Sequence, residues 1–183
     1  MLEYLRIPCY DGKIKIKIYN FRSRENTMDA DNQQERLDEK WITGFTDGEG
    51  CFHISINKIP EMTLGWQVLP EFRIVQHEKN EQLLLKIKEH FGFGEVRVNR
   101  RDFHGTRKEF KVRGLDNLNK IVEFFNRNRL MTSKRKDFEI FSEVINLMNE
   151  GKHLTKDGLD KIARVISLMN RKPKIKYLES SET

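Results

Sequence analysis

The chain has 183 residues, of which 37% are hydrophobic and 34% are charged, and its formal net charge is +6. This length suits one domain with a sizeable core. No apolar run approaches the roughly 18 residues of a membrane span, so we expect no membrane association. The basic balance favours a polyanionic partner, with nucleic acid first. Cys9 and Cys51 lie far apart without a metal-binding pattern, which indicates reduced thiols in an intracellular protein.

Residues 1–35 form a predicted N-terminal extension. Apolar and basic residues alternate strictly from Lys13 to Ile18, which predicts a strand with one basic face, and the polar stretch 20–34 resembles a linker. The extension is either a poorly ordered leader or a basic arm laid along DNA. Glu3 and Asp11 argue against a transit peptide. We place the main domain at 36–172 and a polar tail at 173–183.

A helix is predicted over residues 37–47, because Leu37, Trp41, Gly44 and Phe45 recur at helical spacing. Glycine inside a helix costs about 1 kcal/mol relative to alanine. Gly44 therefore suggests a close backbone approach to another element. The glycines of the segment Asp47-Gly48-Glu49-Gly50 are expected to end this helix, which leaves two carboxylates at its C-terminus.

Carboxylates are mildly unfavourable at a helix C-terminus, where the helix dipole is negative. A bound cation would offset this cost. Mg²⁺ accepts one or two carboxylates, backbone carbonyls and water as ligands. The alternative is a glycine-rich helix end whose acids are simply solvated.

The remaining pattern predicts an α+β fold, in which helices back a four-stranded antiparallel sheet. Strands are expected at 51–57, 66–76, 95–100 and 106–113, and further helices at 80–91, 115–128, 133–149 and 156–169. Pro70 suggests an irregularity or an edge in the second strand. The Gly44–Gly50 pattern has no second copy downstream.

Alternation in the strands separates an apolar face from a polar face rich in arginine. Arginine can recognise guanine, asparagine can recognise adenine, and glutamate can recognise cytosine. A face made only of lysine would bind phosphate without recognising bases. An ordinary solvated sheet face is the alternative. The candidate DNA-binding residues are His53, Ser55, Asn57, Arg73, Arg97, Asn99, Arg101, Arg107, Glu109, Lys111 and Arg113.

Residues 42–50 resemble the signature of the LAGLIDADG homing endonucleases. Ile42 stands for the first leucine of that signature, Thr43 for its alanine and Gly44 for its glycine, and Asp47–Gly50 match its acidic, glycine-containing end. The chain from about residue 37 to 170 also follows the element order of the family. Thr43 is larger and Thr46 more polar than the usual residues.

The resemblance implies an αββαββα fold, with C-terminal helices added and with the sheet as a saddle over double-stranded DNA. It implies a homodimer that packs through Trp41, Gly44 and Phe45. Glu49 and the Gly48 carbonyl would hold Mg²⁺, with two or three ions shared across the dimer. The implied activity is a staggered double-strand break with 3′ overhangs in a long pseudo-palindromic target, which promotes intron mobility.

Two more catalytic residues follow from the resemblance by position. Gln76, at the end of the second strand, matches a residue that positions water, although alternation places it on the apolar side. Lys134 matches a lysine near the scissile phosphate, and Lys136 remains an alternative. A further basic residue of some family members has no clear counterpart, and Lys79 or Asn80 would have to serve.

Other interpretations stay open at this stage. An RNA maturase of the same fold would bind intron RNA, and a DNA-binding regulator would bind without cleaving; Glu49 favours an enzyme, because an acid weakens binding to phosphate. Asp47 is either a second metal ligand or a local cap. The five histidines show no ligand spacing. The family resemblance favours a chloroplast or mitochondrion and leaves a bacterial cytoplasm open.

Overall fold

The computed structural model describes residues 37–169 and 177–178, so the predictions for 1–35 and for most of the tail lie outside the described residues. In chain order the elements are α2 (Glu39–Glu49), β1 (Gly50–Lys58), β2 (Trp66–His77), the 3₁₀ helix η1 (Glu78–Asn80), α3 (Glu81–Phe91), β3 (Glu95–Asp102), β4 (Gly105–Val112), α4 (Leu115–Arg127), α5 (Lys134–Asn149), the 3₁₀ helix η2 (Lys152–Leu154) and α6 (Lys156–Ile166). None of the described helices is long and apolar enough to cross a membrane.

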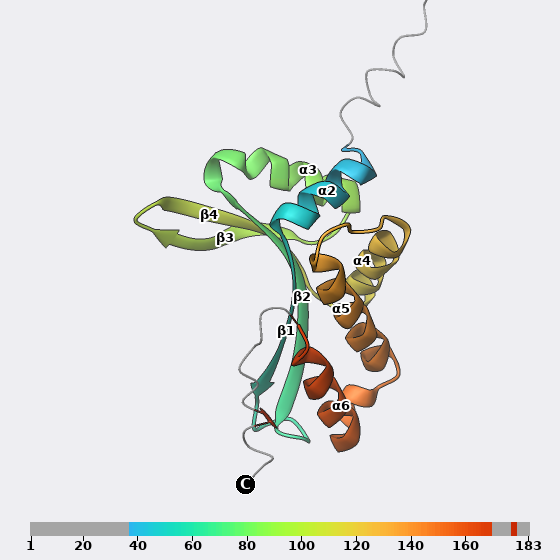
Figure 1. Cartoon of the computed structure of the whole chain (residues 1–183). Coiled ribbons are helices and arrows are strands. Elements are labelled where there is room, and N and C mark those ends of the chain that lie inside the picture. Colours follow the sequence, from blue (N-terminus) through green and yellow to red (C-terminus); the bar gives the residue numbers. More distant parts are fainter. Residues whose placement is uncertain (1–36, 170–176, 179–183) are drawn as a thin grey trace, which may run out of the picture. The chain divides into compact units, whose positions relative to one another are not determined.

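The four strands form one antiparallel sheet in the order β1-β2-β4-β3, which confirms the predicted fold class. β1 pairs with β2 along its whole length, whereas β4 pairs with β2 only from Phe72 to His77. The β1–β2 ribbon and the β3–β4 hairpin therefore extend in different directions from this shared stretch (Figure 1). Pro70 lies in β2 outside the stretch paired with β4, where a residue without an N–H is tolerated.

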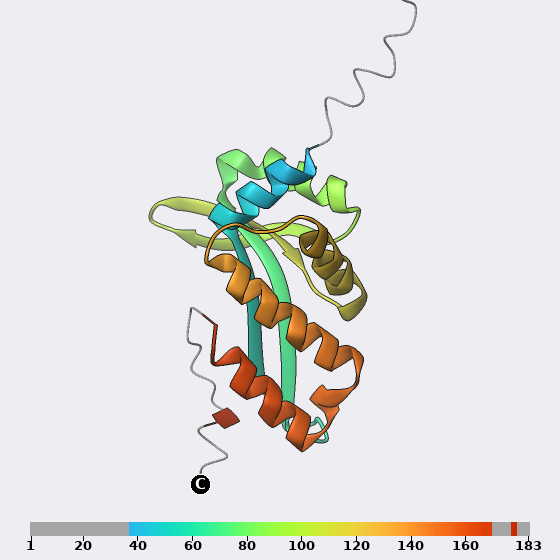
Figure 2. The same ribbon diagram turned by 45° about the vertical axis from the view of Figure 1, so that its right-hand side comes forward.

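The hydrophobic core lies between the sheet and the helices α4, α5 and α6, which gather on one side of β1 and β2 (Figures 1 and 2). Phe52 points into this core from β1 and is 4% exposed. Its ring centroid lies 5.2 Å from that of Phe72, 5.4 Å from Phe125, 5.3 Å from Phe138 and 5.3 Å from Phe141. The alternation predicted for β1 is confirmed, since Phe52 and Ile54 are buried while His53 and Ser55 are partly exposed.

Helix α2 begins and ends two residues later than the sequence pattern predicted. Its N-cap is Asp38, whose carboxylate accepts hydrogen bonds from the backbone N–H groups of Lys40 (2.8 Å) and Trp41 (3.1 Å). The helix continues to Glu49, because Gly50, and not Gly48, makes the tight turn into β1. A Cβ atom at Gly50 would lie 2.5 Å from Thr46 Cγ2, so only glycine fits.

Phe52→Ala should destabilise the fold by about 3–5 kcal/mol, because it removes the ring that four other phenylalanines surround. Denaturant unfolding followed by circular dichroism measures the change. Phe103→Ala is the matched control, since Phe103 is 100% exposed. Equal losses of stability in the two variants would contradict this account of the core.

Candidate active site and nucleic-acid interface

The C-terminal end of α2 places a carboxylate, backbone carbonyls and an amine close together. Glu49 is the last residue of the helix and is exposed. Lys134 opens α5, and its Nζ donates hydrogen bonds to the carbonyls of Thr46 (2.9 Å) and Gly48 (3.2 Å). A cation at this position compensates the negative end of the α2 dipole, whose last turn contains no basic residue of its own.

Asp47 connects α2 to the loop that precedes α5. Its carboxylate accepts hydrogen bonds from the backbone N–H of Met131 (2.7 Å) and from the hydroxyl of Thr132 (2.8 Å). Because this loop leads directly into Lys134, the bonds of Asp47 help to fix the lysine beside the helix end. Among the described residues, no three His, Cys, Asp or Glu side chains gather as a metal site.

A groove of about 780 Å³ opens at this helix end and runs onto the polar face of the sheet. Of the residues selected from the sequence, it is lined by Gly48, Glu49, His53, Arg73, Asn99, Arg107 and Lys134. It also contains residues that sequence reasoning did not select, namely Cys51, Val75, Arg100, Asp137 and Met169. The structure thus unites the acidic helix end, the lysine and several strand cations in one groove.

Gln76 does not join this groove. Its side chain accepts a hydrogen bond from Asn80 Nδ2 at 3.1 Å. The register pairs Gln76 with Lys108, which forms an ion pair with Glu81 of α3, so this residue lies on the helix-covered face. Val75 lines the groove in its place, as strict strand alternation requires.

A β-bulge in β3 changes which arginine faces the groove. The register shifts between Val98 and Arg100, so that Arg100 and not Asn99 lies opposite Arg107. Arg100 therefore shares the polar face with Arg107, and Arg101 falls on the other face opposite Thr106. This corrects the expectation for Arg101, and Arg100 is the residue that sequence reasoning missed.

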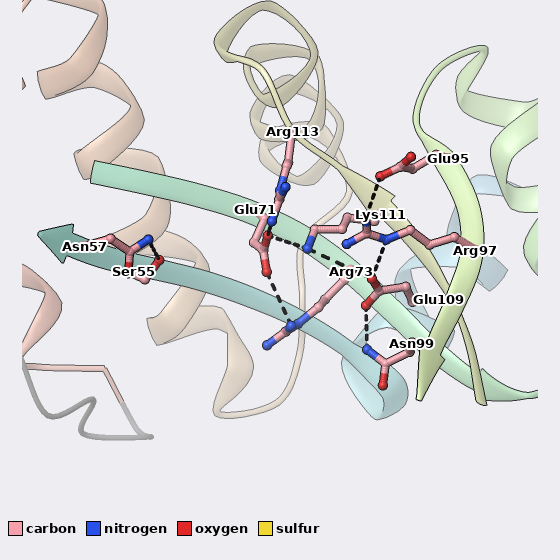
Figure 3. A network of polar contacts seen from close by, with 10 residues as sticks. All are labelled: Ser55, Asn57, Glu71, Arg73, Glu95, Arg97, Asn99, Glu109, Lys111 and Arg113. Carbon is pink, nitrogen blue, oxygen red and sulfur yellow. Dashed lines mark hydrogen bonds and ion pairs between the residues drawn. The ribbon is translucent and has the colours of Figure 1, made fainter. Parts of the chain in front are cut away.

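Two acids lie buried in the polar face of the sheet, and we call them with their partners the carboxylate network (Figure 3). Glu71 of β2 is 4% exposed and Glu109 of β4 is 2% exposed. Glu71 forms ion pairs with Arg73 (3.3 Å), Lys111 (2.6 Å) and Arg113 (2.8 Å), while Glu109 binds Arg97 (2.9 Å) and Asn99 (2.7 Å). Glu71 is not among the residues predicted from the sequence.

The network alters the roles expected of several strand residues. Lys111 is only 5% exposed and lies between the two carboxylates, 4.0 Å from Glu109. Lys111 and Glu109 therefore do not reach outward to a base in this structure, contrary to the expectation. Ser55 and Asn57 lie apart from the network on β1 and bond to each other at 3.3 Å (Figure 3).

The ion pairs control the ionisation of Glu71. Burial by itself would raise the pKa of its carboxyl group, but hydrogen bonds and charges from Lys111 and Arg113 lower the pKa below its ordinary value. On β3, a hydrogen bond to Glu109 raises the pKa of Arg97. Glu71 is thus favoured as an anion beneath the cations that cover it.

Helix α2 has one face that no described residue covers. Ile42 and Thr46 are buried on the inner side, whereas Trp41 is 43% exposed. The Trp41 ring stacks on Phe45, with centroids 4.9 Å apart and an interplanar angle of 13°. A Cβ atom at Gly44 would meet no atom of the described residues within 4 Å outside the backbone of its own helix.

Comparison with known proteins assigns the family. The LAGLIDADG endonuclease family model matches residues 42–145. The crystal structure of the homing endonuclease I-TnaI is 41% identical, with a TM-score of 0.74, and the match covers 80% of this chain and 97% of that one. The LAGLIDADG meganuclease I-CpaMI bound to uncleaved DNA is 25% identical, with a TM-score of 0.74 and coverage of 80% and 48%. The chain belongs to the LAGLIDADG endonuclease family.

Curated relatives carry related names. "Probable intron-encoded endonuclease 2" of Neurospora crassa is 38% identical over 129 residues, which are 69% of this chain and 28% of that protein. "Probable intron-encoded endonuclease 3" of the same species is 29% identical over 161 residues, or 87% of this chain and 29% of that protein. The chain thus spans less than a third of the length of these two relatives.

Ionised Glu71 should stabilise the fold in a pH-dependent way. The pKa of Glu71 is lower in the folded state than its ordinary value of 4.5, which applies to the unfolded chain. The stabilising contribution is therefore fully present above pH 4.5 and is lost as the pH falls through the folded-state pKa. We expect Glu71→Gln to cost up to about 3 kcal/mol of unfolding free energy at neutral pH, since Lys111 then stays buried without the nearer of its two anions.

The gap in unfolding free energy between wild type and Glu71→Gln should shrink in acid, and urea denaturation across a pH series measures it. Glu123→Gln, an exposed change on α4, is the control that loses the same charge. A gap that is the same at neutral and acidic pH would refute the assignment.

Proposed function

We propose that this chain is a site-specific, Mg²⁺-dependent homing endonuclease that makes a staggered double-strand break with 3′ overhangs in a long pseudo-palindromic DNA target. The observation that carries the proposal is the groove in which Glu49, the Gly48 carbonyl and Lys134 meet beside strand arginines. An exposed carboxylate beside these cations would weaken a pure phosphate-binding surface. As a metal ligand, the same carboxylate contributes to hydrolysis.

The residues at the helix end fit Mg²⁺ as part of a shared site. Glu49 offers a carboxylate and Gly48 a carbonyl, and Mg²⁺ commonly takes one or two carboxylates together with water and phosphate oxygens. The bound ion would activate water and polarise the scissile phosphate. The described residues of one chain gather no cluster of three metal-ligating side chains, and we propose that two or three ions are shared between two helix ends and DNA.

Lys134 is the residue that we assign to the charge on the scissile phosphate. Its amine lies at the Gly48 carbonyl and lines the same groove as Glu49, so it would be available to a phosphate that enters this groove. A fixed ammonium group stabilises the charge that develops on phosphate oxygens. Lys136 lies on the same turn of α5 but outside the residues that line the groove, and Gln76 is directed away from it, so neither enters this assignment.

The open face of α2 supports a homodimer. Gly44 leaves space for a second backbone, and the Trp41–Phe45 stack offers apolar surface beside it. Two copies packed through these residues would bring both Glu49 residues to the two-fold axis, one for each DNA strand. The buried position of Thr43 keeps its extra bulk away from this face. Two-fold symmetry in turn requires a nearly palindromic target.

The names of the relatives suggest the genetic setting. The matched proteins of N. crassa are called intron-encoded, and a Podospora anserina relative is described as a protein in ND4 intron 1. We propose the same setting for this chain, with cleavage promoting the spread of its own intron in an organelle genome. The alternatives, binding of intron RNA and DNA binding without cleavage, are distinguished by the experiment below.

Glu49→Gln should reduce DNA cleavage by more than about 100-fold while leaving DNA binding intact, because the amide keeps the shape of the side chain and loses the charge that holds the metal. The purified protein is incubated with a library of long duplexes in Mg²⁺ or Ca²⁺, and the ends are sequenced. Glu139→Gln on the exposed side of α5 is the charge-matched control. Enrichment of bound duplexes without breaks in wild type and Mg²⁺ would reject the endonuclease and direct the search to RNA.

Gly44→Leu should convert the dimer to a monomer and abolish cleavage without unfolding the chain, because a Cβ atom at this exposed position meets no described atom of its own chain within 4 Å. Gly44→Ala, with a smaller addition, should weaken the dimer less. Analytical ultracentrifugation reports the association and circular dichroism the fold. A Gly44→Leu variant that cleaves as a dimer would place the interface elsewhere.

A further inference from the structure

We propose that Glu71 and Glu109 are positioning residues for DNA specificity, which act by fixing the orientation of the arginines that cover them. The inference rests on the proposed function, because it concerns how this surface recognises a particular DNA sequence. The geometry of the carboxylate network carries it (Figure 3), together with the location of the network on the polar face of the sheet, where Arg73 and Asn99 also line the groove.

Buried acids are costly on a surface that binds phosphate. Each carboxylate subtracts from the attraction to DNA, and a buried ion pair contributes little to stability compared with apolar packing. Glu71 and Glu109 nevertheless lie on adjacent strands of the groove-bearing face, with exposures of 4% and 2%. A surface needing only affinity for phosphate would dispense with both.

Each carboxylate binds particular N–H groups of an arginine that lies over it. Glu71 Oε2 accepts from Arg113 through both Nε (2.9 Å) and Nη2 (2.8 Å), which fixes the plane of that guanidinium. Glu109 Oε1 accepts from Arg97 Nε at 2.9 Å. The side chain of Arg113 is 46% exposed and that of Arg97 is 43% exposed. Both are therefore fixed by the buried carboxylates and still reach the surface.

Lys111 joins the two halves of the network. Its Nζ lies 2.6 Å from Glu71 and 4.0 Å from Glu109, beneath the surface. Asn99, the residue at the β3 bulge, donates to the second oxygen of Glu109 at 2.7 Å and also lines the groove. The network therefore spans β2, β4 and β3, and a change at either acid alters donors on more than one strand.

Fixed donors discriminate between bases better than mobile ones. A free arginine side chain loses rotamer freedom when it is ordered, and before ordering it can adapt to whichever acceptor is near. An arginine whose plane is held by a carboxylate presents its remaining N–H groups in one direction, so a base with acceptors elsewhere is rejected. The two carboxylates thus weaken the attraction to DNA phosphate and increase the selectivity for particular bases.

The test compares two changes at one position. Glu71→Gln removes the charge and keeps the shape, and Glu71→Asp keeps the charge and shortens the reach to Arg113. Glu123→Gln on α4 is the charge-matched control, since it is exposed on a helix away from the network. Each full-length variant is used to select duplexes from a randomised pool in Ca²⁺, and the bound duplexes are sequenced.

Both Glu71 variants should relax base preference at the same few adjacent base pairs, with the ratio of specific to non-specific affinity falling about tenfold or more. Only Glu71→Gln should also tighten non-specific DNA binding, because it removes a negative charge. The slope of log affinity against log salt concentration should then become more negative by about one. Glu123→Gln should leave the base preference unchanged.

Wild-type preference at every position in both Glu71 variants would overturn the proposal and leave the network a purely structural role. If Glu71→Gln fails to fold, the base preference of Glu71→Asp alone decides whether the proposal stands. If wild type itself selects no sequence, the proposed function fails and this inference fails with it. Relaxed preference in the variants beside a selective wild type supports both.

Discussion

The tight turn at Gly50 is the constraint on which the site depends. No side chain fits there, because a Cβ atom would lie 2.5 Å from Thr46 Cγ2 and 2.9 Å from the Thr46 carbonyl oxygen. The turn joins α2 directly to β1, so Glu49 ends the helix at the groove and Phe52 enters the aromatic core two residues later. A functional carboxylate held between a packed helix and a packed strand is placed more precisely than one on a loop.

The features that the sequence predicted well are those set by local periodicity. Alternation with a period of two assigns the faces of β1 and β4 because it requires no knowledge of the partner strand. The same parity placed Gln76 on the apolar side, and its side chain indeed contacts Asn80 and not the groove. The end of α2 was misjudged because both Gly48 and Gly50 can end a helix, and only the contact with Thr46 distinguishes them.

The features that the sequence did not reveal depend on pairing between distant residues. The bulge at Asn99 arises from the register between β3 and β4, and it decides whether Arg100 or Arg101 faces the groove. Glu71 lies between Pro70 and Phe72, where composition gives no sign of an ion pair, and it bonds to a partner 42 residues along the chain. Neither feature has a local signature, because both exist only once the sheet is assembled.

The carboxylate network also suggests how affinity and selectivity are divided on this surface. The net charge of +6 provides attraction to a polyanion over the whole chain, so the sheet does not need every one of its cations for that purpose. Four cations in the sheet instead share two buried acids. Lys134 is likewise held by hydrogen bonds to the carbonyls at the end of α2. In both places charge is fixed in direction at the expense of reach, as the proposed recognition of one sequence and cleavage at one phosphate would require.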